Sequence, residues 1–147
     1  IAYTFEFADK SYIIYSIKVN HGKFVISLDF ELMWGVREVK SIATYGNNVA
    51  GVHQVIPKLL KTFREFGIEA TFSTVGFLFF ETKKDLLNHI PSVLPHYNNP
   101  ILSPYNGYFD SIGEDYKADI YHFAPHLIKE IQRYPEQEIG THTFSHM

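Results

Sequence analysis

The sequence predicts an α/β fold in which short parallel strands alternate with helices. Residues 23–28, 68–75 and 138–141 are short runs rich in apolar or β-branched side chains, which is typical of strands. Amphipathic helical patterns lie between these runs. Parallel neighbouring strands need a long crossover connection, so this alternation favours a parallel sheet with helices packed against it.

The composition describes one globular domain without a marked charge bias. The chain has 147 residues, of which 46% are hydrophobic, and 13 Lys and Arg face 16 Asp and Glu. A net charge of -3 provides no basic excess for phosphates, so we do not expect nucleic acid as a partner. There is no Cys, so any metal ligand must be His, Asp or Glu. No apolar run is long enough for a membrane span or a signal peptide, and both a cytoplasmic and a cell-envelope location stay open.

Residues 1–21 form an N-terminal extension with its own pattern. Tyr3, Phe5 and Phe7 alternate with other residues, and residues 12–19 form a second β-branched run. Two short strands around Asp9 and Lys10 would make a β-hairpin. The second unit, residues 22–147, carries the α/β pattern.

The elements of the second unit follow in order. Residues 23–28 are almost all apolar, as in a strand buried on both faces, and end at acids. Next comes the clearest helix, which stops at Gly67. Pro57 lies in its first turn or bends it, so we place its start between Val52 and Pro57. After the strand 68–75, residues 83–90 form a weaker helix with Thr82 as N-cap.

The remainder of the chain contains a long segment and one more helix. Residues 90–125 are rich in Asn, Pro, Tyr and Gly and have no clear period, which favours a loop inserted at the substrate edge. A third helix starts at Pro125 and continues to about Tyr134, before the last strand.

Two histidines follow the last predicted strand. His142 and His146 have the spacing that lets two imidazoles reach one metal ion, and they stand where α/β folds place their sites. With 8 histidines in the chain, such a spacing also arises by chance, and His122 and His126 form a second pair. We interpret that second pair as loop and first-turn residues without a ligand role.

Two acids follow the first strand of this unit. Asp29 and Glu31 emerge from an apolar run, where a carboxylate is costly unless it is paired or bound to metal. The alternative is that Asp29 caps a turn and that Glu31 is solvated. Together with His142 and His146, the acids form a donor set that suits Zn²⁺ or another divalent transition ion and leaves one acid free as a base.

Three stretches resemble the polysaccharide deacetylases, the NodB-like domain of carbohydrate esterase family four. They are FVISLDFELMWG (24–35), IEATFSTVGF (68–77) and EIGTHTFSHM (138–147), and the resemblance covers about residues 22–147. It implies the N-terminal half of an irregular (β/α) barrel. It also implies a metal-dependent hydrolase that removes N-acetyl groups from a polysaccharide or glycan, with Zn expected and Co, Ni or Fe as alternatives. In this match Asp29 is the catalytic base, and His142 and His146 are metal ligands.

The chain departs from the family pattern in two ways. Phe30 stands where the family usually has its second Asp, so the acidic ligand is assigned to Glu31, as in branches that resemble Asp-x-Glu. The family's later motifs lie outside this sequence. We therefore expect a fragment that is inactive alone, with an open barrel edge and an uncovered apolar face that favour self-association.

Aromatic residues are the predicted substrate contacts, namely Trp34, Tyr105 and Tyr108. Two other functions remain open. One is an amidase for a small amide or ureide, which uses the same metal chemistry. The other is a non-catalytic carbohydrate-binding module that needs no metal.

Overall fold

The computed structural model describes residues 2–7, 10–15 and 22–146. Its secondary-structure elements, five strands, three α-helices and four 3-10 helices (η), are β1 (Ala2–Phe7), β2 (Lys10–Tyr15), β3 (Ser27–Phe30), η1 (Leu32–Gly35), α1 (Ile42–Phe66), β4 (Thr71–Thr74), η2 (Gly76–Phe79), α2 (Lys83–Asn88), η3 (Pro100–Leu102), η4 (Tyr108–Ser111), α3 (Pro125–Ile131) and β5 (Glu138–Thr141).

The strands β1 and β2 pair antiparallel in the segment where the sequence predicts a hairpin. Their register runs from Ala2 opposite Tyr15 to Phe7 opposite Lys10. Residues 8–9 and 16–21, which include the predicted turn and the end of the second run, lie outside the described residues.

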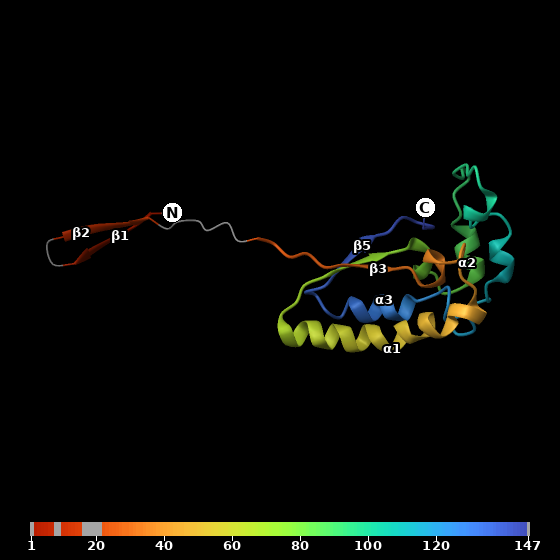
Figure 1. The fold of residues 1–147 in the computed structure, drawn as a ribbon, viewed down its shortest axis with the longest axis horizontal. Helices are drawn as coiled ribbons and strands as arrows, with labels where there is room; N and C mark the ends of the chain where they lie inside the picture. Colours follow the sequence, from red (N-terminus) through yellow and green to blue (C-terminus); the bar gives the residue numbers. More distant parts are fainter. Residues whose placement is uncertain (1, 8–9, 16–21, 147) are drawn as a thin grey trace.

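Three strands of the second unit form a parallel sheet in the order β3-β4-β5. Helix α1 connects β3 to β4, and α3 lies between β4 and β5 in the chain. Both helices lie on the same side of the sheet (Figure 1). The described strands do not close into a barrel.

The core lies between the sheet and these two helices. Phe30 and Phe72 point to this side and are 3% and 1% exposed. Burying such large apolar side chains is the main stabilising term of the fold. The helices contribute the buried side chains Val49, Ile56, Leu60, Phe63, Leu127, Ile128 and Ile131.

The other face of the sheet is polar. Ser27 and Ser73 lie side by side with their hydroxyl oxygens 3.0 Å apart, and Thr71 donates a hydrogen bond of 2.5 Å to Glu138. Asp29 lies in the same alternating set of residues. The predicted uncovered apolar face is therefore wrong for the described strands, because their free face carries hydroxyl and carboxylate groups that water solvates. What remains unpaired is the outer edge of β3 and that of β5.

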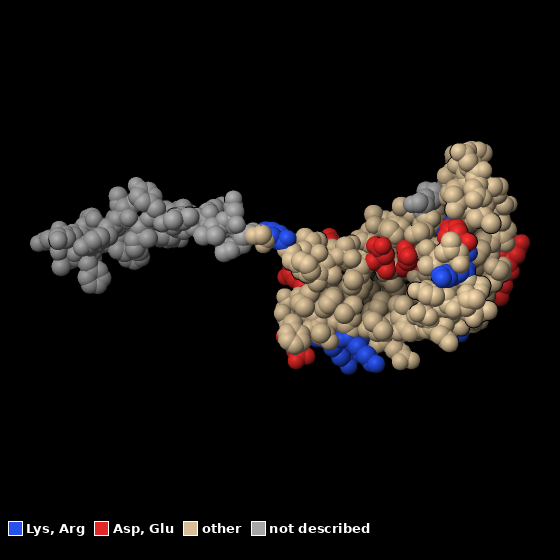
Figure 2. Space-filling view, in the orientation of Figure 1, with Lys and Arg blue, Asp and Glu red and all other residues tan. Residues whose placement is uncertain are grey.

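Charged side chains are spread thinly over the surface drawn in Figure 2. Lys and Arg occur there in small separate groups among acidic ones, without a broad basic area on that face. In the described part of the chain, no helix combines the length and the apolar character needed to cross a bilayer.

The strand β3 begins and ends later than the sequence predicts. Its partner β4 begins at Thr71, whose amide donates to the Ile26 carbonyl. Residues before this point lack a partner in the ladder, and Phe24 and Val25 are 91% and 77% exposed. Asp29 consequently lies within the strand, and only Glu31 follows it.

The helix α1 begins at least ten residues before the predicted start, so Pro57 lies in its interior and not in its first turn. Ser41 is its N-cap: its hydroxyl accepts from the Thr44 amide at 3.3 Å, and the Thr44 hydroxyl accepts from the Ser41 amide at 3.2 Å. This capping box has Thr where Glu or Gln is usual. The first turns also contain Gly46 and Gly51, which weaken a helical pattern. The end at Gly67, in left-handed conformation, is as predicted.

The predicted loop 90–125 is packed against the rest of the unit. Backbone hydrogen bonds from Lys83 to Glu114 and from Tyr116 to Glu81 attach it to the start of α2. As predicted, Thr82 caps α2, accepting from the Asp85 amide at 3.0 Å. The segment also contains η3 and η4 and buried polar residues, so its irregular sequence encodes an ordered arrangement rather than a free loop.

Candidate metal centre

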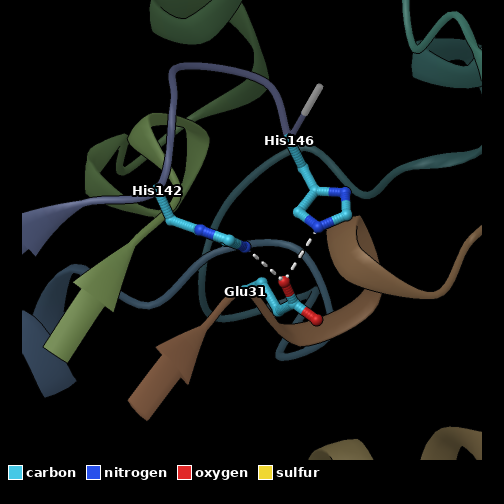
Figure 3. Close-up of side chains that lie close together, drawn as sticks. All are labelled: Glu31, His142 and His146. Carbon is cyan, nitrogen blue, oxygen red and sulfur yellow. Dashed lines mark ion pairs between the residues drawn. The ribbon is translucent and has the colours of Figure 1, made fainter. Parts of the chain in front are cut away.

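Glu31, His142 and His146 meet at the carboxyl end of the sheet. Glu31 follows β3, and both histidines follow β5. One carboxylate oxygen, Oε2 of Glu31, lies 3.1 Å from His142 Nε2 and 3.0 Å from His146 Nε2. Figure 3 shows the carboxylate between the two imidazoles. Parallel strands end at one edge, so residues 111 positions apart in the chain reach one point.

The three side chains fit a divalent transition ion. Their donor atoms all lie within 4.8 Å of one another. The side chains of Glu31, His142 and His146 are 22%, 32% and 27% exposed, so the centre is partly buried but open to solvent. Two imidazole nitrogens and one carboxylate are a common set of protein ligands for catalytic zinc, which keeps a further position for water or substrate. Among the described residues this is the one group of three such ligands.

The backbone after β3 folds Glu31 back over Gly35. A Cβ atom on Gly35 would overlap the Glu31 carboxylate, so the glycine leaves room for this side-chain conformation of Glu31. Between them, Leu32 has a left-handed φ of 49°. An L-residue in this region is strained by about 1–2 kcal/mol, so surrounding contacts must hold it. The turn that places Glu31 is therefore a strained one that its neighbours maintain.

Backbone hydrogen bonds to β4 and η2 hold the turn that carries both histidines. The His142 amide donates to Thr74, and the amides of Gly76 and Phe77 donate to the carbonyls of Thr143 and Phe144 at 3.0 Å. A Cβ on Gly76 would lie 2.7 Å from a ring carbon of Phe144, so this approach also needs glycine. These contacts fix the two imidazoles on the side that faces Glu31.

Asp29, the predicted base, lies outside the group of three ligands. It is exposed on the polar face of β3, in register with Ser73 on β4 and Gly140 on β5. One residue, Phe30, separates it from Glu31, along the strand that leads to the metal centre. Its exposed carboxylate is free of a burial cost, and its role as base remains a prediction.

The aromatic residues predicted to contact substrate have different positions. Trp34 is fully buried in the core, against Phe77, so its indole has no exposed face for a sugar. The predicted substrate contact is therefore wrong for Trp34, because rings from distant segments, those of Phe77 and His122 among them, pack around it. Tyr105 and Tyr108 are partly buried and remain candidates. Burial raises the pKa of Tyr108 to about 12.

Of the second histidine pair, His126 lies in the first turn of α3, as predicted, where it is exposed and hydrogen-bonded to His53 on α1 at 3.0 Å. His122 belongs to a buried polar network that the sequence interpretation does not include: it is 1% exposed and hydrogen-bonded to Asp119 and Tyr108. Burial opposes ionisation of Asp119, but hydrogen bonds from His122 and backbone amides lower the pKa of its carboxyl overall. The spacing Asp-x-x-His is the sequence signal for the contact between Asp119 and His122.

The comparisons give no family assignment: no protein-family model, curated protein or solved structure matches this chain. The likeness of three stretches to deacetylase motifs therefore stays a prediction. Support for a function comes from the arrangement of Glu31, His142 and His146.

Proposed function

We propose that this protein is a metal-dependent hydrolase that removes N-acetyl groups from a polysaccharide or glycan. The observation that carries the proposal is the convergence of Glu31, His142 and His146 on one point, with donor atoms within 4.8 Å. These are the residues that the resemblance to the deacetylases assigns to the metal. The centre lies at the carboxyl end of a parallel sheet, where α/β enzymes bind their substrates.

The chemistry divides between metal ligands and a base. A bound divalent ion supplies Lewis acidity, which activates water and polarises the acetamide carbonyl. Glu31, His142 and His146 would hold that ion through carboxylate oxygen and imidazole nitrogen atoms. Asp29 accepts the proton of the attacking water, as a general base with a free carboxylate. The partial exposure of the three ligands leaves room for a substrate to approach.

The free face of the sheet is polar, as a sugar-binding surface can be. Ser27, Ser73 and Glu138 carry hydroxyl and carboxylate oxygens on the strands whose carboxyl ends meet at the centre. Sugar hydroxyl groups form hydrogen bonds with such groups. A small amide or a ureide is the alternative substrate.

We expect acetate release from N-acetylglucosamine oligosaccharides by the natural protein that contains this chain, when it is loaded with Zn²⁺. The measurement compares loaded protein, chelator-treated protein and the Glu31→Gln variant, with a small amide and a ureide as parallel substrates. Acetate release that needs both metal and Glu31 supports the proposal. Turnover of only the small amide or ureide assigns the site to an amidase, and sugar binding without stoichiometric metal makes the protein a carbohydrate-binding module.

The partial barrel of the proposed fold predicts self-association. The outer edges of β3 and β5 have no partner among the described strands, and unpaired strand edges are templates for another chain. We expect the 147-residue chain to form dimers or larger species in light scattering as its concentration rises. A strictly monomeric, folded chain at high concentration contradicts the partial barrel.

A further inference from the structure

Outside the metal centre, a buried polar chain links Asp119, His122 and Tyr108. Asp119 Oδ2 lies 2.8 Å from His122 Nδ1, and His122 Nε2 lies 2.8 Å from the Tyr108 hydroxyl. Asp119 and His122 are 5% and 1% exposed. A carboxylate and an imidazole at this depth are costly unless their hydrogen bonds are satisfied.

The hydrogen bonds of this polar network determine which of its atoms donate and which accept. Asp119 also accepts from the backbone amides of Gly113, Tyr121 and His122, which favours the carboxylate form. A carboxylate can only accept, so His122 donates from Nδ1 to Asp119. In the tautomer with its proton on Nδ1 alone, Nε2 accepts from the Tyr108 hydroxyl. Every member of the network is paired, and each bond depends on the next.

The same segment holds the turn that follows Glu31. The His122 carbonyl accepts from the Trp34 indole at 2.8 Å, and the Tyr121 carbonyl accepts from the Met33 amide at 3.1 Å. Both donors follow the left-handed Leu32, which comes directly after the metal ligand Glu31. The Trp34 ring also contacts the rings of His122 and Tyr108, with centroids 5.2 and 5.6 Å away.

We propose that Asp119, His122 and Tyr108 are positioning residues for Glu31. They fix residues 121 and 122, whose carbonyl oxygens hold Met33 and Trp34, and this keeps the strained turn at Leu32 in the conformation that directs the Glu31 carboxylate at both histidines. The inference rests on the proposed function in one respect, namely that Glu31 binds the metal. It does not depend on the substrate.

Removing the Tyr108 hydroxyl tests the network by deleting one hydrogen bond, the one to His122 Nε2. In Tyr108→Phe, the buried Nε2 of His122 loses its hydrogen-bond partner. This favours a movement of the imidazole or a change of its tautomer. We expect the affinity for Zn²⁺, measured by competition with a chromophoric chelator, to fall about tenfold, since changes that disturb the orientation of metal ligands typically cost 10–100-fold. Trp34, the single tryptophan, should also change its emission in this variant without metal.

Tyr105→Phe is the matched control. Tyr105 packs in the same aromatic cluster, against Phe77 and Phe109, but the hydrogen bonds of the network do not include it. Its variant should keep wild-type Zn²⁺ affinity. A Tyr108→Phe protein that unfolds at a lower temperature yet keeps wild-type Zn²⁺ affinity has lost only a structural contact, and that result overturns the positioning role.

A measurement on the wild-type protein keeps the test valid if Tyr108→Phe does not fold. Zn²⁺ binding at Glu31 should change Trp34 emission, with the same Kd as the chelator competition, because coupling between the two is reciprocal. Zn²⁺ binding without any change in Trp34 emission contradicts the positioning role but not the metal centre. A wild-type protein that binds no Zn²⁺, or binds it equally well as Glu31→Gln, contradicts the metal centre and the proposed function with it.

Discussion

Glu31→Gln should lose most of its bound metal. The change replaces the one anionic ligand by a neutral amide and leaves His142 and His146 as the strong protein ligands, one fewer than catalytic zinc sites usually have. Changes outside the ligand shell alone cost about 10–100-fold in metal affinity, so we expect a loss of at least roughly 100-fold here. Metal content after gel filtration, together with Kd from chelator competition, measures the effect.

The control for this prediction is a second Glu→Gln change away from the centre. Glu114 has a side chain that is 84% exposed and 3.8 Å from Lys83, so Glu114→Gln changes the same charge without touching the ligands. It should keep full metal. His142→Ala should lose metal as Glu31→Gln does, because it removes one of the same three ligands. Full metal in both Glu31→Gln and His142→Ala would show that the ion has other ligands.

The candidate site could be predicted from the sequence because its residues are short-range features of strand ends. Each donor comes within a few residues of a strand terminus, and parallel strands bring their carboxyl ends to one edge. The set Glu31, His142 and His146 needs only that topology, and the structure places these side chains together. The choice of Glu31 as the acidic ligand came from the resemblance to branches with Asp-x-Glu, and Phe30, which is 3% exposed in the core, has no donor atom.

The parts that the sequence did not predict depend on contacts between distant segments. Trp34 is an aromatic residue near the site, and nothing local distinguishes a sugar platform from a core residue. Its burial results from Phe77 and His122, 43 and 88 positions later in the chain. Gly46 in α1 similarly leaves room for Tyr121, whose ring lies 3.2 Å from the position that a Cβ on Gly46 would take. Periodicity does not show such pairings, so it predicts neither the start of α1 nor the ordered packing of residues 90–125.

Asp29→Asn is expected to separate catalysis from metal binding. Asparagine keeps the size of the side chain and most of its hydrogen bonding, but it cannot accept a proton as a base. Asp29 lies outside the group of three ligands, so the metal should stay. Turnover by the natural protein should fall by about 10²–10⁴-fold, the usual effect of losing a general base. Because Asp29 is exposed on β3, we expect no large loss of stability in this variant.

The pair of variants then assigns the two acids by their opposite effects. Glu31→Gln should lose metal and, as a consequence, activity, whereas Asp29→Asn should lose activity with metal at wild-type stoichiometry. Metal content, Kd for Zn²⁺ and the deacetylation rate are measured on the same preparations, and thermal unfolding shows that each variant is folded. If Asp29→Asn loses its metal while Glu31→Gln keeps both metal and rate, the roles are reversed: Asp29 is then the ligand, and the turn at Leu32 directs Glu31 to the histidines for a structural purpose only.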